Sequence, residues 1–64
     1  MQVSEVKANL GQLVVYNGSS YRLTAYILRH DKSGKLRYQL ELSDTKARSV
    51  LIVPMHEVEV QDVD

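Results

Sequence analysis

The residues of this chain that could take part in catalysis are few and stand apart from one another. Its only imidazoles, His30 and His56, are each followed by a carboxylate, Asp31 and Glu57. Such adjacent pairs lack the third group of a catalytic triad, and they provide fewer than the three or four ligands of a metal site. The sequence contains no glycine-rich phosphate loop and no dinucleotide fingerprint. We therefore expect no enzymatic activity, no metal, no cofactor and no small-molecule substrate.

Charge and aromatic side chains point instead to binding. Residues 21–37 carry five basic side chains against one carboxylate, a net charge of +4, whereas residues 39–64 carry a net charge of −4. Half-exposed tyrosines favour interfaces, because they combine rigid contact area with a hydroxyl group. The alternative is that the cations keep an edge strand from aggregating and the tyrosines cover the edge of the fold. The binding residues that we predict are Tyr16, Tyr26, Arg29, Lys32, Lys35 and Arg37.

Two functions are consistent with this pattern. The first is a non-catalytic adaptor module that binds a protein partner or a second copy of itself, favoured by zero net charge and oppositely charged segments. The second is weak nucleic-acid binding, in which Tyr26 stacks on a base while the cations of the hairpin around Asp31 contact phosphates. We prefer the first, because a chain without net positive charge has little non-specific attraction for nucleic acid.

Strand patterns separated by turn signals must position these side chains. Residues 12–16 run into Asn17-Gly18, the strongest short signal for a β-hairpin. A long strand follows, from residue 21 to about residue 30. We expect it to bend partway, because its second face changes from polar to apolar. Its first face is wholly apolar and is predicted to point toward the core: Tyr21, Leu23, Ala25 and Ile27.

The second half of the chain continues in the same manner after a turn at residues 31–34. Residues 35–42 alternate, which predicts a strand with one buried face: Leu36, Tyr38, Leu40 and Leu42. Residues 50–53 are all apolar and predict a strand that is buried on both sides or lies at the centre of the barrel. Pro54 ends it, residues 55–57 suit a single 3₁₀ turn, and residues 58–60 form the last strand. Tyr21 and Tyr38 are predicted to be core residues.

The two ends are less regular. Residues 1–10 predict either an extended arm anchored by Val3 and Val6 or one helical turn capped by Ser4. Residues 62–64 are predicted to fray. The chain has no cysteine, no apolar run long enough to span a bilayer and no N-terminal pattern of a signal peptide, so we expect a cytoplasmic protein without a membrane partner.

The order of these elements resembles the SH3-like small β-barrels, a group that includes Tudor and KOW modules. Tyr16-Asn17-Gly18 followed by Tyr21 is similar to the first hairpin of such domains, and residues 53–60 resemble their final strand, 3₁₀ turn and closing strand. The resemblance implies an all-β, five-stranded, partly open SH3-like barrel over residues 11–61. This chain departs from the peptide-binding members in having no Trp and no Phe, which argues against a proline-binding groove. Residues 7–12 and 21–26 also resemble short uncharacterised proteins of bacterial mobile elements.

Overall fold

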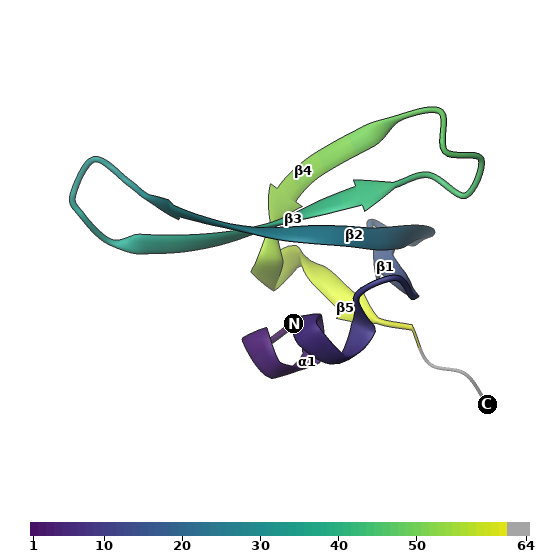
Figure 1. The fold of residues 1–64 in the computed structure, drawn as a ribbon, viewed down its shortest axis with the longest axis horizontal. Coiled ribbons are helices and arrows are strands. Elements are labelled where there is room, and N and C mark those ends of the chain that lie inside the picture. Colours follow the sequence, from purple (N-terminus) through teal and green to yellow (C-terminus); the bar gives the residue numbers. More distant parts are fainter. Residues whose placement is uncertain (62–64) are drawn as a thin grey trace.

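A curved antiparallel sheet with a short helix beneath it makes up the molecule (Figure 1). The computed structural model describes residues 1–61, so the predicted fraying of residues 62–64 lies outside the described residues. The five strands and the single 3₁₀ turn before the last of them confirm the predicted all-β fold. The elements in order are α1 (Val3–Asn9), β1 (Leu13–Tyr16), β2 (Ser19–His30), β3 (Leu36–Ser43), β4 (Val50–Pro54), η1 (Met55–Glu57) and β5 (Val58–Val60).

The strand order in the sheet is β4-β3-β2-β1-β5, and every pairing is antiparallel. The two edge strands, β4 and β5, are therefore neighbours in sequence, separated only by η1. The sheet curls toward closure at this point, but β4 and β5 are not hydrogen-bonded to each other. The fold is a partly open barrel, as predicted.

The tight turn between β1 and β2 follows from its two central residues. Asn17 and Gly18 adopt φ angles of 52° and 79°. Positive φ at both central positions defines a type I′ turn, whose twist matches that of the flanking strands. The turn sets Tyr16 opposite Ser19 and thereby fixes the register of the first hairpin.

The core lies between the sheet and α1. Each of the five strands and the helix contributes to it, and the buried residues are Val6, Val14, Leu23, Leu40, Leu42, Val53 and Val58. The predicted helix cap at Ser4 is wrong. The helix begins at Val3, after Gln2 as the capping residue, and Glu5 Oε1 accepts a hydrogen bond of 2.9 Å from the Gln2 backbone N–H. A carboxylate three residues after the cap satisfies a donor that the helix itself cannot pair.

A β-bulge in β2 changes which of its side chains face the core. Leu23 lies opposite Leu42 and Ala25 lies opposite Glu41, so Thr24 is an extra residue in the ladder. The Thr24 hydroxyl donates to Glu41, in contacts of 3.1 Å to the backbone oxygen and 2.6 Å to Oε2. A bulge of this kind bends the strand and shifts the alternation by one residue. The predicted bend is present, but the predicted burial of one continuous face is wrong from Ala25 onward.

Strand β4 also differs from its prediction. It lies at the sheet edge, with Val53 buried but Val50 and Ile52 exposed by 58% and 46%. Within residues 1–61, no layer covers the outer face of the sheet at these two residues. The continuous apolar run therefore does not reflect burial on both sides.

Candidate interaction surface

The end of the β2–β3 hairpin projects beyond the rest of the molecule as a two-stranded ribbon. Strand β1 pairs with β2 only as far as Arg22, and β4 pairs with β3 only from Gln39 onward. Residues 28–38 therefore form a ribbon without a third strand, and we call this ribbon, together with Tyr26 and Ile27 at its base, the arm. The molecule measures 39 × 26 × 18 Å, and Figure 1 shows the arm extending along the longest of these dimensions.

The two faces of the arm differ in chemistry. Side chains directly opposite each other in an antiparallel pair share a face. Tyr26 pairs with the buried Leu40, so the face that carries Tyr26 continues the core face of the sheet; we call it the inner face. Its next pairs are Leu28 with Tyr38 and His30 with Leu36, the last pair at the end of the ladder.

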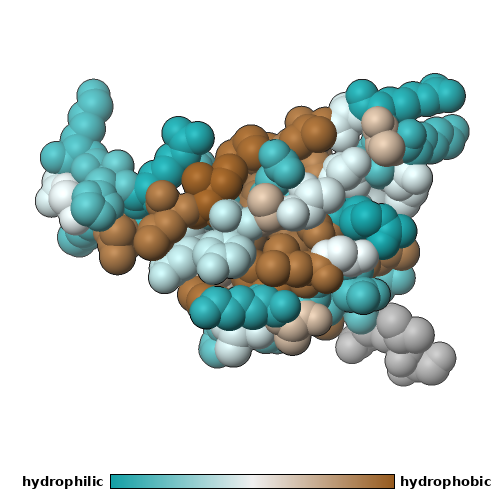
Figure 2. Space-filling view, viewed as in Figure 1, coloured by the Kyte–Doolittle hydropathy of each residue, from teal (hydrophilic) through white to brown (hydrophobic). Residues whose placement is uncertain are grey.

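The inner face extends beyond the core, and within residues 1–61 its apolar side chains are left exposed to solvent there. Tyr26, Leu28 and Leu36 are exposed by 41%, 49% and 53%, and Tyr38 is half-buried. The predictions that Leu36 and Tyr38 are core residues are therefore wrong, because the layer formed by α1 and η1 ends before the arm does (Figure 1). Figure 2 shows hydrophobic residues continuing from the body into the arm, up to a hydrophilic tip.

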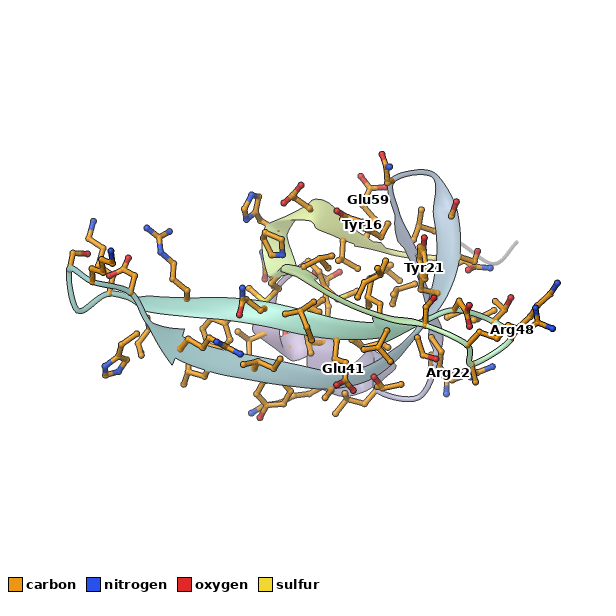
Figure 3. All side chains as sticks on the ribbon, turned by 90° about the horizontal axis from the view of Figure 1, so that it is seen from above. Tyr16, Tyr21, Arg22, Glu41, Arg48 and Glu59 are labelled. Carbon is orange, nitrogen blue, oxygen red and sulfur yellow. The ribbon has the colours of Figure 1, made fainter. Side chains whose placement is uncertain are left out.

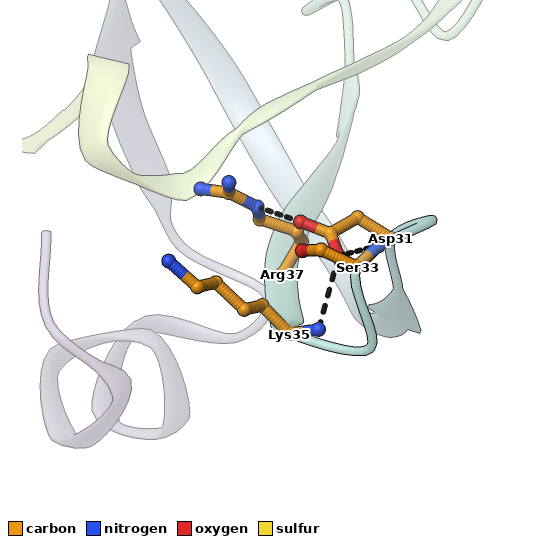
Figure 4. A network of polar contacts seen from close by, with 4 residues as sticks. All are labelled: Asp31, Ser33, Lys35 and Arg37. Atoms are coloured by element: carbon orange, nitrogen blue, oxygen red, sulfur yellow. Dashed lines mark hydrogen bonds and ion pairs between the residues drawn. The ribbon is translucent and has the colours of Figure 1, made fainter.

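The tip of the arm is organised around one carboxylate (Figure 4). Asp31 Oδ1 accepts hydrogen bonds from the Ser33 backbone N–H, the Ser33 hydroxyl and the Lys35 backbone N–H, at 2.9, 2.7 and 3.0 Å. Its other oxygen forms an ion pair of 3.0 Å with Arg37 Nε. Gly34, at a φ of 83°, completes the turn in a conformation that side chains disfavour. The arm thus ends in a defined turn rather than a loose loop.

These contacts lower the pKa of Asp31 from its ordinary value of 3.8 to about 2, first through the Ser33 hydroxyl and then through the Lys35 amide. Since the pKa in the folded protein is depressed, the network is complete above the ordinary value and is lost as the pH falls through about 2. We expect the Lys35 amide resonance to titrate with a midpoint of about 2 in NMR spectra. Ser33→Ala should move this midpoint upward, and a midpoint of 3.8 in the unchanged chain would contradict the network.

The structure brings some of the predicted binding residues together and separates others. Arg29 and Arg37 are cross-strand partners on the outer face, opposite to the face of Tyr26. Figure 4 shows the Lys35 side chain extending in the same direction as that of Arg37. Lys32 lies exposed in the turn itself. Stacking by Tyr26 and phosphate contacts by the two arginines therefore belong to different surfaces.

Tyr16 lies away from the arm. Its ring packs edge-on against Tyr21, with centroids 6.2 Å apart and planes at 63°, and both rings contact the core. Arg22 also stays with the body, where its guanidinium donates to the Gly11 backbone oxygen at 2.6 Å. Figure 3 shows the labelled Tyr16 and Tyr21 side chains near β1, far from the hairpin tip.

An acidic hollow of about 390 Å³ adjoins Tyr16. Its lining comes from the β1–β2 turn, η1 and β5, namely Tyr16, Asn17, His56, Glu57 and Glu59. The pairing of β5 with β1, which sets Glu59 opposite Val15 and Val58 opposite Tyr16, places these residues side by side (Figure 3). Among residues 1–61 the ion pair of Arg37 with Asp31 stands alone, so the carboxylates of Glu57 and Glu59 have no cationic partner.

Sequence reasoning missed Leu28 and Leu36 as surface residues, and it missed Glu57 and Glu59 as neighbours of Tyr16. The exposure of Leu28 and Leu36 could have been predicted from the unequal lengths of the strands. A strand of ten residues beside one of five must extend beyond it, and apolar residues on the overhang then lack a partner. The second pair carries no local signal, because only the register between the first and last strands brings them together.

Within residues 1–61, no three His, Asp or Glu side chains gather in a way that could hold a metal ion. In the same part of the chain, none of the helices has the length and apolar character needed to cross a membrane. Comparison of the chain with protein-family models, with curated proteins and with solved structures finds no match.

Proposed function

We propose that this chain is a non-catalytic protein-interaction module on an SH3-like barrel, and that the inner face of the arm is its binding surface. The observation that carries the proposal is the continuation of the core face beyond the core, which leaves Tyr26, Leu28 and Leu36 about half exposed on one side of the ribbon. Contiguous exposed apolar side chains mark interaction surfaces in soluble proteins. Because the chain lacks cysteine, we propose the cytoplasm as its compartment.

The arm is suited to binding in energetic terms. Complete burial of a large apolar side chain contributes about 1.5–3 kcal/mol, so covering three that are already half-buried contributes on the order of 1 kcal/mol each. The Asp31 network orders the tip before any partner arrives. A preordered ribbon loses less conformational entropy on association than a loop does. Both effects favour a partner that lies against the inner face.

A photo-crosslinking side chain at position 36 tests this proposal. In a lysate of the organism that encodes the chain, we expect a discrete protein adduct from position 36. An excess of unlabelled wild-type chain should prevent this adduct, whereas an excess of the Tyr26→Ser, Leu28→Ser variant should not. The matched control is the same side chain at position 50, since Val50 is similarly exposed but lies on the outer face of β4. Equal adducts from both positions, or none from position 36, would overturn the proposal.

Weak nucleic-acid binding is a second candidate, favoured by the shape of the arm. A two-stranded β-ribbon fits the major groove of DNA, and Arg29, Lys32 and Lys35 have no carboxylate partner among residues 1–61. The Tyr26 ring lies on the opposite face of the arm from Arg29, so it would not stack on a base while Arg29 contacts a phosphate. Binding would then rest on phosphate contacts alone, without base stacking.

A salt titration decides this candidate. Three phosphate contacts imply about 40-fold weaker binding to duplex DNA at 200 mM than at 50 mM salt. We expect Lys32→Glu with Lys35→Glu to abolish the signal, whereas Lys46→Glu with Arg48→Glu, which changes the net charge equally in the β3–β4 loop, should leave most of it. The absence of any salt-dependent signal with labelled DNA or RNA at high micromolar protein would exclude nucleic acid as the ligand.

A further inference from the structure

Strand β2 has a free edge along the arm. On its β1 side, β2 is occupied only as far as Leu23, whose N–H donates to the Gln12 oxygen at 2.9 Å and whose oxygen accepts from the Gly11 N–H at 2.8 Å. The chain before these residues belongs to α1. Beyond Leu23 no strand of residues 1–61 pairs with this side of β2, and Figure 3 shows it as an outer edge of the arm. An added strand would continue the line of β1 toward the tip.

The register of the hairpin identifies the backbone groups that point toward this edge. Backbone groups of successive residues in a strand point alternately to its two sides. The Asp31 N–H donates to the Lys35 oxygen at 2.9 Å, so the groups of Arg29, two residues earlier, also point toward β3. The residues whose N–H and C=O groups point to the free edge are Tyr26, Leu28 and His30.

The arm would be stabilised by a third strand at this edge. A two-stranded ribbon by itself is marginally stable in water, whereas three strands with an apolar face form a stable sheet. Proteins commonly protect exposed edges with a proline or a bulge. The bulge of β2 lies at Thr24, before the free edge, and the single proline, Pro54, lies in β4. The β3 side of the arm offers less, because β4 covers it from Gln39 onward and leaves only residues 36–38.

Charge selects the chemistry of the added strand. Arg29 lies directly opposite Arg37 on the outer face, and like charges in this arrangement repel each other. Arg37 is neutralised by its ion pair with Asp31, whereas Arg29 has no carboxylate partner within residues 1–61. A strand that places Asp or Glu beside Arg29 supplies the missing counter-charge. The outer-face side chains of this strand are therefore expected to be acidic.

The inner face sets the alternate positions of the added strand. Side chains that stand beside Tyr26 and Leu28 lie on the inner face and extend its apolar surface, so they are expected to be apolar. A second copy of this chain does not meet both requirements. The outer-face residues of its own β2 edge are Ile27 and Arg29, which offer no carboxylate. The edge instead fits an extended segment in which apolar and acidic residues alternate.

We propose that the arm binds by strand addition: an extended segment of a partner protein, with alternating apolar and acidic residues, pairs with β2 from Tyr26 to His30 and sets a carboxylate beside Arg29. This inference rests on the proposed function and names the binding mode and the chemistry of the partner. In strand addition the main-chain hydrogen bonds supply affinity, and the alternate side chains supply specificity.

A capped pentapeptide of alternating valine and glutamate, titrated to about 5 mM, tests the pairing. At ten times its dissociation constant, we expect the outward amide protons of Tyr26, Leu28 and His30 to exchange with water about tenfold more slowly in NMR spectra. The matched control is the amide of Leu36, which points to the opposite edge of the arm and should keep its exchange rate. Unchanged exchange at the three β2 amides, or equal slowing at Leu36, would overturn the inference.

Two N-methylated versions of the peptide distinguish strand pairing from side-chain contact alone. Methylation of the valines removes the N–H groups on one side of the peptide strand, and methylation of the glutamates removes those on the other side. Only one side can donate to β2. We therefore expect one version to lose binding and the other to retain it, whereas equal loss or equal retention would contradict strand addition.

Arg29→Glu tests the charge preference in an arm that should remain folded, because the new carboxylate lies opposite Arg37. We expect the glutamate peptide to bind this variant about fivefold more weakly than it binds the unchanged chain. A peptide with lysine in place of glutamate should show the reverse preference. The control is Lys46→Glu, which changes the net charge equally in the β3–β4 loop and should bind like the unchanged chain. The same loss in both variants would overturn the inference.

The outcome is separable from that of the proposed function. If the crosslinker at position 36 captures a protein specifically while no peptide protects the β2 amides, the partner lies on the inner face without adding a strand, and only this inference is excluded. Slower exchange of the same amides at rising protein concentration without peptide would identify a second copy as the occupant and would also overturn it. If the crosslinker captures nothing and no peptide binds, both proposals fail.

Discussion

Leu40→Ala is expected to lower the free energy of unfolding by about 3 kcal/mol, a large part of the stability of a domain this small. Leu40 is fully buried, and it lies between Tyr26 on β2 and Val53 on β4. Removing three of its carbon atoms leaves a cavity that a sheet fixed on both sides cannot close. A chain of 64 residues has a total stability of roughly 3–10 kcal/mol. Urea denaturation followed by circular dichroism should show the midpoint falling sharply, with an unfolded fraction at least about 100-fold higher in water.

The informative control is the same substitution four residues earlier. Leu36 lies on the same strand and on the same face as Leu40, but it is 53% exposed at the tip of the arm. Leu36→Ala should therefore change the free energy of unfolding by no more than about 0.5 kcal/mol. A similar loss of stability for both variants would mean that the inner face of the arm is part of the core. The contrast between the two leucines thus measures where the core ends and the binding surface begins.

The parts of the fold that depend on neighbouring residues were predictable from the sequence. The Asn17-Gly18 turn, the burial of Leu40 and Leu42 in β3 and the 3₁₀ turn after Pro54 all follow from local sequence patterns, and the structure confirms them. The five strands and the open barrel follow from placing these pieces in order. Local preference is enough here, because each turn residue fixes the register of the strands that it joins.

The faces of the arm were not predictable, because they depend on one unpaired residue. Alternation alone puts Ala25 and Ile27 with Leu23, whereas the bulge at Thr24 puts Tyr26 and Leu28 there instead. The bulge is held by the contacts of Thr24 with Glu41, which is 17 residues away in sequence. This long-range contact decides that the arm has an apolar inner face and a cationic outer face. The candidate site is therefore a consequence of tertiary structure.

The helix α1 also depends on tertiary contacts that local sequence patterns do not reveal. A segment of seven residues is too short to be stable as an isolated helix, so α1 must be held by packing. Its single buried residue is Val6, which is 1% exposed, and the N-terminal ammonium group donates a hydrogen bond of 3.0 Å to the Val58 backbone oxygen. Residues 1–10 therefore share their core with the strands and cover the open side of the curved sheet (Figure 1).

Val6→Ala is accordingly expected to destabilise the whole domain by about 2 kcal/mol, from two lost methyl groups and the cavity that they leave. The neighbouring Lys7→Ala, on the exposed side of the same helix, should change the free energy of unfolding by less than about 0.5 kcal/mol. Both substitutions place the best helix former at their positions, so helix propensity cannot explain a loss in the first variant alone. If α1 were only an appendage, Val6→Ala would leave the unfolding midpoint of the sheet unchanged. A joint shift of helix and sheet signals in one transition would instead show that the helix completes the core from which the arm projects.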